Sequence, residues 1–369
     1  MTEHFVGLMS GTSMDGIDAV LVSFGDAAVE IHATHSQLYP APLRDALIEA
    51  ANTSLDVPLD ESGELNRQVG ECFRDAACAV ISTSGVANTD IVALGSHGQT
   101  LRHQPNAEQP FSLQIGDANI IATGTRVTTV ANFRAADIQA GGQGAPLVPP
   151  FHHWLFGTDE RPRAIVNIGG IANATYLPTD DSDIIGFDTG PGNGLMDAWV
   201  RQNLAQPFDE NGDWAASGKV INALLDAFLQ DDYFQSPPPK STGFEYFNKK
   251  WLERFGIEDS AAADVQTTLC ELTAMTISQA IRDHCADADE VFICGGGVRN
   301  LELMRRLERN LPETSVMSTA AMGLDPDWVE AVAFAWLAMR TIKGQTGNLP
   351  SVTGASHKVV LGDIHSPYS

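Results

Sequence analysis

The sequence predicts a two-domain α/β protein in which one α/β unit occurs twice, and three observations predict it. The chain has 369 residues, and domains usually contain about 100–200 residues, so two domains are expected. Hydrophobic residues make up 43% of the chain, which is enough to build real cores. The same order of elements, a hairpin with a Gly-rich turn, a third strand and then helices, begins near residue 5 and again after Pro162.

The first half opens with three short runs of alternating apolar and polar residues, which predict strands. Two segments of helical apolar spacing follow, and then a buried strand that ends in a polar cluster. In chain order we expect strands at 5–9, 17–24 and 29–38, helices near 42–51 and around 65–80, and a strand at 91–95.

The second half repeats this order with a longer helical part. We expect strands at 164–168, 171–177 and 184–187, helices near 192–203 and 215–230, a long helix at 264–285, a strand at 291–294 and helices at 300–310 and 328–342. The predicted domains are residues 1–130, to which 343–369 return, and residues 131–342. The Gly-rich stretch 141–146 is the candidate hinge, and the Pro-rich stretch 236–239 is expected to be an exposed loop.

The excess of acidic over basic residues limits the kinds of partner that we expect for this chain. Asp and Glu number 47 against 22 Lys and Arg, so the formal charge is −25. An acidic surface repels phosphate backbones and anionic lipids, and we expect neither nucleic acid nor membrane as a partner. Five cysteines without CxxC spacing predict a reducing cytoplasm, no disulfide framework and no structural zinc site.

A first candidate phosphate-binding turn lies between the first two predicted strands. Small residues there let backbone N–H groups approach a phosphate, and a carboxylate can hold a hydrated Mg²⁺. The candidate nucleotide-binding residues are Gly11, Thr12, Ser13, Met14, Asp15, Gly16, Ile17 and Asp18, and Asp15 and Asp18 are the candidate Mg²⁺ ligands. An ordinary β-hairpin turn has a similar composition, and that interpretation stays open.

A second turn follows the strand predicted at 184–187. The strand delivers Asp188 at its carboxyl end, and a Gly-Pro-Gly turn that includes Gly190 then opens a helix. Open α/β sheets bind their ligands at these ends, and a helix N-terminus favours anions. Asp188 is therefore a candidate catalytic base or metal anchor, and the alternative is that it only caps the next helix.

Two further turns are still richer in glycine. Gly295, Gly296 and Gly297 follow a strand, but neither a Walker loop nor the dinucleotide G-x-G-x-x-G pattern is present. Gly169 and Gly170 occupy, in the second half, the place of the first turn. Each turn alone fits a tight structural turn, whereas four at strand ends predict a nucleotide site facing a central cleft.

Polar residues near these turns suit a sugar or polyol. Ser96, His97 and Gly98 end a buried strand, and Arg134 can pair with a substrate carboxylate through two hydrogen bonds. Glu330 lies near the start of the last long helix. We take these five residues as candidate substrate contacts. The alternatives are a core histidine, an internal salt bridge for Arg134 and a helix-dipole role for Glu330.

Seven motifs together resemble anhydro-N-acetylmuramic acid kinase, a family of the sugar kinase, actin and heat-shock chaperone superfamily. They are residues 7–18 (GLMSGTSMDGID), 96–100 (SHGQT), 167–173 (NIGGIAN), 187–193 (FDTGPGN), 240–243 (KSTG) with Glu245, 294–298 (CGGGV) and 327–331 (DWVEA). The resemblance implies a two-domain actin-like ATPase fold, that is, a duplicated ribonuclease-H-like fold with a central nucleotide and substrate cleft.

The resemblance also implies an activity in cell-wall recycling. ATP with Mg²⁺ would phosphorylate O6 of anhydro-N-acetylmuramic acid while the 1,6-anhydro ring is opened by water, and Asp188 would be the base that activates this water. An ordinary sugar or polyol kinase and a filament or chaperone ATPase remain the alternatives. The expected partners are the sugar and ATP in the cytoplasm, and a homodimer is left open.

Overall fold

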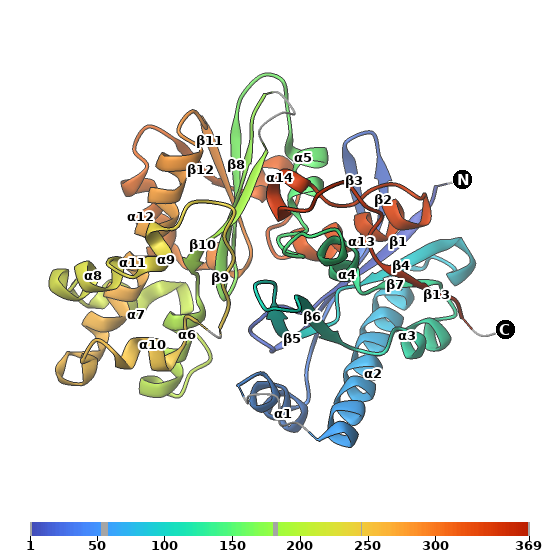
Figure 1. Ribbon diagram of the computed structural model, residues 1–369, viewed down its shortest axis with the longest axis horizontal. Helices are drawn as coiled ribbons and strands as arrows, with labels where there is room; N and C mark the ends of the chain where they lie inside the picture. Colours follow the sequence, from blue (N-terminus) through green and yellow to red (C-terminus); the bar gives the residue numbers. More distant parts are fainter. Residues whose placement is uncertain (1, 53–57, 180–183, 245, 368–369) are drawn as a thin grey trace. The chain divides into compact units, whose positions relative to one another are not determined.

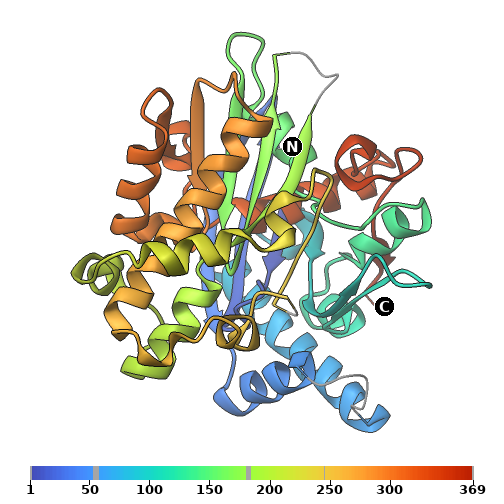
Figure 2. The same ribbon diagram turned by 60° about the vertical axis from the view of Figure 1, so that its left-hand side comes forward.

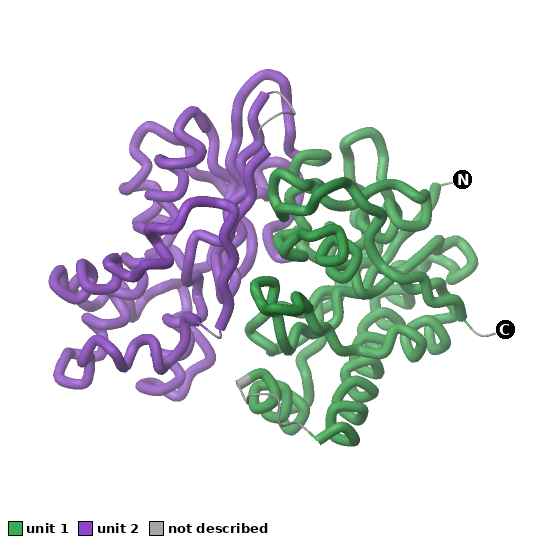
Figure 3. Tube along the Cα trace, in the orientation of Figure 1, with its two compact units in different colours: residues 1–155, 328–369 green, residues 156–327 purple. Residues whose placement is uncertain are grey.

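The computed structural model describes residues 2–52, 58–179, 184–244 and 246–367, which divide into two compact units (Figure 3). Unit 1 comprises residues 1–155 and 328–369, and unit 2 comprises residues 156–327. The predicted boundaries after residues 130 and 342 therefore have to be moved. The helix formed by residues 329–342 packs on strands of the unit 1 sheet, and residues 131–155 group with unit 1 as well.

Unit 1 contains a six-stranded sheet in the order β13-β7-β4-β1-β2-β3 (Figure 1). The first three strands form an antiparallel meander, β4 is parallel to β1, β7 is parallel to β4, and β13 is an antiparallel edge strand. The strands are β1 (His4–Met9), β2 (Gly16–Gly25), β3 (Ala28–Leu38), β4 (Ile91–Ser96), β7 (Thr129–Ala131) and β13 (Asp363–His365). A separate hairpin of β5 (Gln99–Gln104) and β6 (Phe111–Ile115) was not predicted.

Helices lie on both faces of the unit 1 sheet. They are α1 (Ala41–Asn52), α2 (Leu59–Ser84), α3 (Ala118–Thr125), α4 (Phe133–Gln139), α5 (Pro149–Phe156), α13 (Val329–Ile342) and α14 (Pro350–Thr353). Successive strand residues face opposite sides, so Val6 and Leu8 of β1 share a core with Val69 and Phe73 of α2. Gly7, between them, faces α13 on the other side.

Two glycines let α13 lie directly on the sheet. Gly7 of β1 and Gly95 of β4 are neighbours in the parallel register. A Cβ on Gly7 would lie 1.8 Å from the carbonyl oxygen of Ala331, and a Cβ on Gly95 would lie 2.0 Å from that of Phe334. Because any side chain at these positions would collide with the helix backbone, these two glycines permit the close approach of α13.

Unit 2 has a five-stranded sheet in the order β10-β9-β8-β11-β12. The strands are β8 (Arg163–Ile168), β9 (Ile171–Leu177), β10 (Ile185–Pro191), β11 (Glu290–Cys294) and β12 (Ser315–Ser318). Its first three strands are an antiparallel meander, and the fourth and fifth continue parallel to the first. This is the order of β3-β2-β1-β4-β7 in unit 1. The predicted duplication of one α/β unit, the arrangement expected for the actin-like superfamily, is thus confirmed.

The helices of unit 2 are α6 (Gly194–Leu204), α7 (Asp213–Ser217), α8 (Asn222–Leu229), α9 (Asp232–Gln235), α10 (Lys249–Glu253), α11 (Ala262–His284) and α12 (Leu301–Asn310). Helix α11 packs against β9 and β10 and also contacts α12 (Figure 2). The single helix predicted at 215–230 is wrong. The chain is extended at Gly218, where a Cβ would lie 2.4 Å from the carbonyl oxygen of Ala263, so α7 and α8 are separate.

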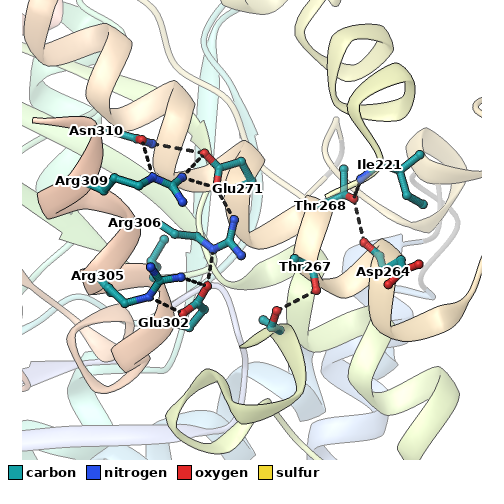
Figure 4. Close-up of polar contacts among 12 residues, drawn as sticks. Ile221, Asp264, Thr267, Thr268, Glu271, Glu302, Arg305, Arg306, Arg309 and Asn310 are labelled. Atoms are coloured by element: carbon teal, nitrogen blue, oxygen red, sulfur yellow. Dashed lines mark hydrogen bonds and ion pairs between the residues drawn. The ribbon is translucent and has the colours of Figure 1, made fainter. Parts of the chain in front are cut away.

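A buried network of ion pairs joins α11 to α12 (Figure 4). Glu271 of α11 accepts hydrogen bonds from Arg306 and, at 2.7 Å, from Nη2 of Arg309. Glu302 accepts from Nε of Arg306 at 2.7 Å and from Nη2 of Arg305 at 2.7 Å. Burial alone would raise the pKa of Glu271, but the hydrogen bonds from Arg309 and Arg306 outweigh it and lower the pKa. The network therefore holds Glu271 ionised inside unit 2.

Among the helices of the described segments, none combines the length and the apolar character needed to cross a membrane.

Candidate active site

Three of the predicted turns lie at one edge of the unit 2 sheet. Strands β8, β10 and β11 run in the same direction, so their carboxyl ends share that edge. Gly169 and Gly170 follow β8, Asp188 and Gly190 lie in the last residues of β10, and the glycines 295–297 follow β11. The topology thus brings together all the unit 2 residues that the sequence singled out.

The turn after β10 is held on the turn after β8 mainly by backbone hydrogen bonds, with one further bond from Nδ2 of Asn193 to the carbonyl oxygen of Ile168 at 3.2 Å. The N–H groups of Gly192 and Gly194 each donate to the carbonyl oxygen of Gly170 at 3.0 Å, and that of Asn193 donates to Gly169 at 2.8 Å. A Cβ on Gly192 would lie 2.3 Å from the Gly169 oxygen. Because two backbone segments touch here, residue 192 must be glycine for packing, whatever the turn binds.

The three glycines after β11 differ in what surrounds them. Gly295 has φ +76°, and a Cβ there would lie 2.3 Å from Oδ1 of Asn167, while one on Gly297 would lie 2.4 Å from the Ile168 side chain. At Gly296 the nearest atom to such a Cβ is Nδ2 of Asn193, 3.9 Å away. Of these three glycines, Gly296 alone would accept a Cβ without a close contact.

Asp188 is held in place by the segment that follows α9. The backbone N–H of Thr242 donates to Oδ2 of Asp188 at 2.9 Å, and the N–H of Asp188 donates to the carbonyl oxygen of Lys240 at 3.0 Å. The hydroxyl of Tyr233 donates to the carbonyl oxygen of Asp188 at 2.8 Å. These bonds explain why the KSTG motif accompanies Asp188; Glu245 of that motif lies outside the described residues.

The side chains around Asp188 are partly buried from solvent. Nζ of Lys240 lies 4.7 Å from the centre of the Tyr233 ring, and burial lowers its pKa although the charge of Asp188 opposes this. Burial, with the Asp188 charge, raises the pKa of Tyr233. Oγ1 of Thr242 is buried without a hydrogen-bond partner in the described part of the chain. A water molecule or substrate hydroxyl near Asp188 would satisfy that atom.

Unit 1 presents a second set of predicted residues at the corresponding edge of its own sheet. Strands β1, β4 and β7 are parallel, so their carboxyl ends share one edge. The turn containing Gly11 follows β1. Ser96 is the last residue of β4 and His97 comes directly after it, and Arg134 lies in α4, which follows β7.

Buried side chains support the turn after β1. The Ser10 hydroxyl lies 2.6 Å from the carbonyl oxygen of Gly16 and 2.8 Å from Oε1 of Gln99, and it accepts a hydrogen bond from the Tyr39 hydroxyl at 3.2 Å. Nε2 of Gln99 donates to the carbonyl oxygen of Gly11 at 3.2 Å. Burial raises the pKa of Tyr39. This network ties the SHGQT segment to the first glycine turn, a link that sequence reasoning missed.

The predicted residues of this turn divide into three groups. Thr12 and Ser13 are exposed, and a Cβ on Gly11 would meet nothing nearer than Oγ of Ser13 at 4.0 Å, so its backbone is open. The side chains of Met14 and Ile17 belong to the core of unit 1 and cannot face a ligand, and the N–H of Met14 donates to the carbonyl oxygen of Gly11 at 3.3 Å. Gly16 is needed for packing, because a Cβ there would lie 2.5 Å from the Gln37 carbonyl oxygen.

Arg134 and His97 form a fixed pair. Nη2 of Arg134 donates to Nε2 of His97 at 2.8 Å, and Nη1 donates to the carbonyl oxygen of Gly144 at 2.8 Å. Arginine only donates, so His97 accepts and is neutral with its proton on Nδ1. Burial, with the nearby Arg134 charge, lowers the pKa of His97 to about 3, which agrees with this assignment. Both acceptors are uncharged, so these two bonds do not neutralise the guanidinium.

The other predicted substrate contacts have distinct settings. Oγ of Ser96 is buried and, among the residues described, has no hydrogen-bond partner. Gly98 has φ +72° and a Cβ there would lie 2.8 Å from the Ile115 carbonyl oxygen, so this glycine serves the turn into β5. Glu330 is in the first turn of α13, one turn before Phe334, whose ring lies 4.7 Å from that of His97. Glu330 and Phe334 therefore share a helix face.

The candidate Mg²⁺ ligands carry hydroxyl partners. Ser13 donates to Oδ1 of Asp15 at 2.8 Å, and Ser36 donates to Oδ1 of Asp18 at 2.7 Å. Within the described segments, no group of three or more His, Cys, Asp or Glu side chains is arranged to hold a metal. Mg²⁺ usually needs only one or two carboxylates besides phosphate oxygens and water. An exposed Asp15 beside an open glycine backbone fits that requirement.

Comparison with known proteins decides the family. The family model described as anhydro-N-acetylmuramic acid kinase matches residues 3–367. The chain is 48% identical to the anhydro-N-acetylmuramic acid kinase of Shewanella halifaxensis over 366 residues, and 47% identical to that of Coxiella burnetii over 365 residues. These alignments cover 98% of this chain and 98% and 97% of the relatives. The chain belongs to the anhydro-N-acetylmuramic acid kinase family.

Membership of the anhydro-N-acetylmuramic acid kinase family extends over both sets of predicted residues, since the match spans both units. Solved structures are more distant. An activator of 2-hydroxyisocaproyl-CoA dehydratase from Clostridium difficile, with bound ADPNP, is 13% identical with a TM-score of 0.46 over 92% of this chain and 96% of its own. A ROK family glucokinase from Streptomyces griseus is 12% identical with a TM-score of 0.42 over 91% and 99%.

Proposed function

We propose that this family member uses ATP to convert 1,6-anhydro-N-acetylmuramic acid into N-acetylmuramic acid 6-phosphate and ADP. Water adds to the anomeric carbon, the bond from that carbon to O6 breaks, and O6 takes the γ-phosphoryl group of ATP. The product is the kind of amino-sugar phosphate that cell-wall recycling consumes. The observation that carries the proposal is Asp188, placed among three glycine turns in a chain that the family model matches from residue 3 to 367.

Asp188 acts in this scheme as the general base. Its carboxylate removes a proton from the attacking water, and the Thr242 N–H on Oδ2 keeps the carboxylate oriented. Loss of a positioned general base typically lowers the rate about 10²–10⁴-fold. The neighbouring Oγ1 of Thr242, buried without a partner among the described residues, supports a polar ligand close to Asp188.

The nucleotide is assigned to the glycine turns. The open backbones at Gly11 and Gly296 support contact with phosphate or with a flat ring, and Asp15, with Asp18, would hold the Mg²⁺. The metal, when bound, neutralises charge on the phosphate oxygens. Backbone N–H groups suit a chain whose formal charge is −25, because they bind anions without requiring a basic surface.

The sugar is assigned to the second set of residues. Ser96, His97 and Glu330 offer polar groups for hydroxyls, and the Arg134 guanidinium pairs with the substrate carboxylate. The neutral state of His97 supports this role, because a charged imidazole could not accept the hydrogen bond from Arg134. We propose that the reaction takes place in the cytoplasm. The homodimer stays a prediction, which sedimentation would test.

The test is the Asp188→Asn variant assayed in oxygen-18 water. The amide keeps the shape of the side chain but cannot take the proton, so ring opening and phosphorylation should fall together by about 10²–10⁴-fold. Mass spectrometry of the wild-type product should find the label on the anomeric carbon and none in the phosphate.

The matched control is Asp226→Asn, the same change on the exposed surface of α8, which should turn over as the wild type does. Label in the phosphate, or a phosphorylated sugar whose anhydro ring is intact, would instead favour an ordinary sugar kinase. An Asp188→Asn variant with normal turnover would remove Asp188 from the role of base.

A further inference from the structure

Asp137 is a fully buried carboxylate whose two oxygens serve two different segments of unit 1. Oδ2 accepts a hydrogen bond from the backbone N–H of Gly144 at 2.8 Å. Oδ1 accepts from Nδ2 of Asn348 at 2.7 Å and from Oγ1 of Thr353 at 2.7 Å. The two donors on Oδ1 come from the C-terminal part of the chain, 211 and 216 residues further along the sequence.

Gly144 passes this restraint on to Arg134. Its N–H is held by Asp137, and its carbonyl oxygen accepts the hydrogen bond from Nη1 of Arg134 at 2.8 Å. Its φ is +70°, and a Cβ there would lie 2.8 Å from the Ile138 side chain, so the position is restricted to glycine. The two bonds leave this peptide little freedom. Arg134, which also binds His97 at 2.8 Å, is thereby oriented from two sides.

The rest of the turn is also built around the Asp137 carboxylate. The N–H of Gly142 donates to the backbone oxygen of Asp137 at 2.9 Å, and a Cβ on Gly142 would lie 2.2 Å from Oδ2. Residues 141–146 were predicted to be a hinge between domains. They lie inside unit 1 and are fastened by these bonds, so that prediction is wrong.

A buried carboxylate is costly unless each oxygen is satisfied, and hydrophobic residues often replace such groups without loss of stability. Core packing therefore does not explain why a carboxylate stands at residue 137. A requirement to hold one backbone N–H and two side-chain donors at once does explain it, because only a carboxylate accepts on both sides.

We propose that Asp137 is a positioning residue for sugar binding, which acts through Gly144 to fix the guanidinium of Arg134. The proposal rests on the proposed function, in which Arg134 binds the carboxylate of the substrate. Asn348 and Thr353 make the C-terminal segment part of the same support. Asp137 touches neither substrate nor ATP in this scheme, so its removal affects the KM of the sugar and spares the KM of ATP.

The experiment compares Asp137→Asn with Thr125→Val in the full-length enzyme. The asparagine must turn its NH₂ toward either Gly144 or the C-terminal donors, so one side of the support is lost. Thr125→Val is the control for loss of stability, because it removes a buried hydroxyl that bonds only within α3 and the turn after it. That hydroxyl donates to the carbonyl oxygen of Ile121 at 2.7 Å and accepts from the N–H of Val127. We expect Asp137→Asn to raise the sugar KM by up to about 100-fold with the ATP KM unchanged. Thr125→Val should leave both unchanged.

A double-mutant cycle separates positioning from general destabilisation. In an Arg134→Gln background, adding Asp137→Asn should cause no further loss of kcat/KM for the sugar, because the residue through which Asp137 acts is already gone. Independent, multiplying losses would overturn the proposal, and so would a parallel rise of both KM values. If Asp137→Asn does not fold, Thr353→Val is measured instead and should give the same selective rise at smaller size; an unchanged sugar KM would overturn the proposal.

These outcomes are distinct from a failure of the proposed function. If the wild type does not phosphorylate the anhydro sugar at all, the proposed function fails. If the wild type is active and Asp137→Asn keeps a normal sugar KM, only the positioning role of Asp137 fails.

Discussion

The first hairpin turn of each unit occupies the same place in the same strand order, yet the two turns are held by different means. In unit 1 the turn is supported by the buried side chains of Ser10, Gln99 and Tyr39. In unit 2 the turn at Gly169 is supported by backbone N–H groups of residues 192–194. Duplication has preserved the topology and the position of the turns, and the supporting contacts have diverged.

The buried ionisable groups diverge in the same way. Unit 1 buries His97 and His152 as well as the Asp137 carboxylate, whereas unit 2 buries the ion pairs of Glu271 and Glu302 and no histidine as deeply among its described residues. Neutral imidazoles and ionised carboxylates respond to protons over different ranges of pH. The two units, although alike in fold, are therefore expected to lose stability under different conditions, and three measurements test how they differ.

The largest expected effect is in the ion-pair network of unit 2. Glu271→Gln keeps the shape of the side chain but leaves Arg306 and Arg309 without its charge, which should lower the free energy of unfolding by about 3–5 kcal/mol. Glu253→Gln is the control, because its ion pair with Lys249 is exposed and should contribute less than about 1 kcal/mol. Chemical denaturation measures both. Equal small losses would mean that burial adds nothing to the Glu271 network.

The next effect tests how much the backbone contact between Gly192 and Gly169 contributes to holding the unit 2 turn. Gly192→Val forces a side chain against the Gly169 oxygen and should cost about 1–3 kcal/mol of stability. Gly296→Val places its side chain in open space, so it should fold normally while the KM for ATP rises. Thermal melts and ATP kinetics separate the two variants. Normal ATP kinetics in folded Gly296→Val would move the nucleotide away from that turn.

The third effect is the response of unit 1 to acid, which is small near neutral pH and grows as the pH falls. Burial lowers the pKa of His152 to about 3 from an ordinary value of 6.5, so between these values the unfolded chain binds one proton more than the folded chain. Its contribution to stability is complete above pH 6.5 and falls by about 1.4 kcal/mol per pH unit as the pH drops toward 3. His97, whose pKa is also lowered to about 3, behaves alike.

Unit 2 should lose less over the same range, because His284 is its one histidine and is only partly buried, although burial lowers its pKa as well. The pKa values of Glu271 and Glu302 are lowered from the ordinary 4.5, so their contribution is lost only as the pH falls below about that value. Hydrogen exchange at pH 7 and pH 5, corrected for intrinsic rates, should therefore show a larger loss of protection in β4 than in β8. His152→Gln should flatten the response of unit 1, and equal losses in both units would contradict the comparison.

Much of the fold could be predicted because it depends on local pattern. The alternation of apolar residues predicted β1, β8 and β9 to within a residue at each end, and helical spacing predicted α11 and α13 almost as closely. The hairpin of β5 and β6 was missed, since its strands are polar and largely outside the core. The unit boundaries were misplaced because α13 belongs to unit 1 through contacts with Gly7 and Gly95, which no local pattern reveals.

In the candidate site, too, the residues that could be predicted are those with a local sequence pattern. The turns and Asp188 were predictable, because a glycine-rich stretch or an Asp after a strand is visible in sequence. Gln99, Tyr39 and Asp137 were not assigned their roles, because each acts through partners that are remote along the chain. The one available signal was the unusual density of glycine at 141–144, which reflects a turn built around a carboxylate rather than a flexible link.

The close packing of α13 on Gly7 and Gly95 also has a consequence for the order in which the two units are completed during synthesis. The helix that covers one face of the first sheet is encoded after the whole of unit 2, whose residues 156–327 are contiguous. A ribosome therefore releases everything that unit 2 needs before it releases α13 and β13, which complete unit 1. Until α13 is synthesised, the glycines of β1 and β4 have no helix packed on them. Unit 2 begins later in the sequence than unit 1, but its synthesis is completed earlier.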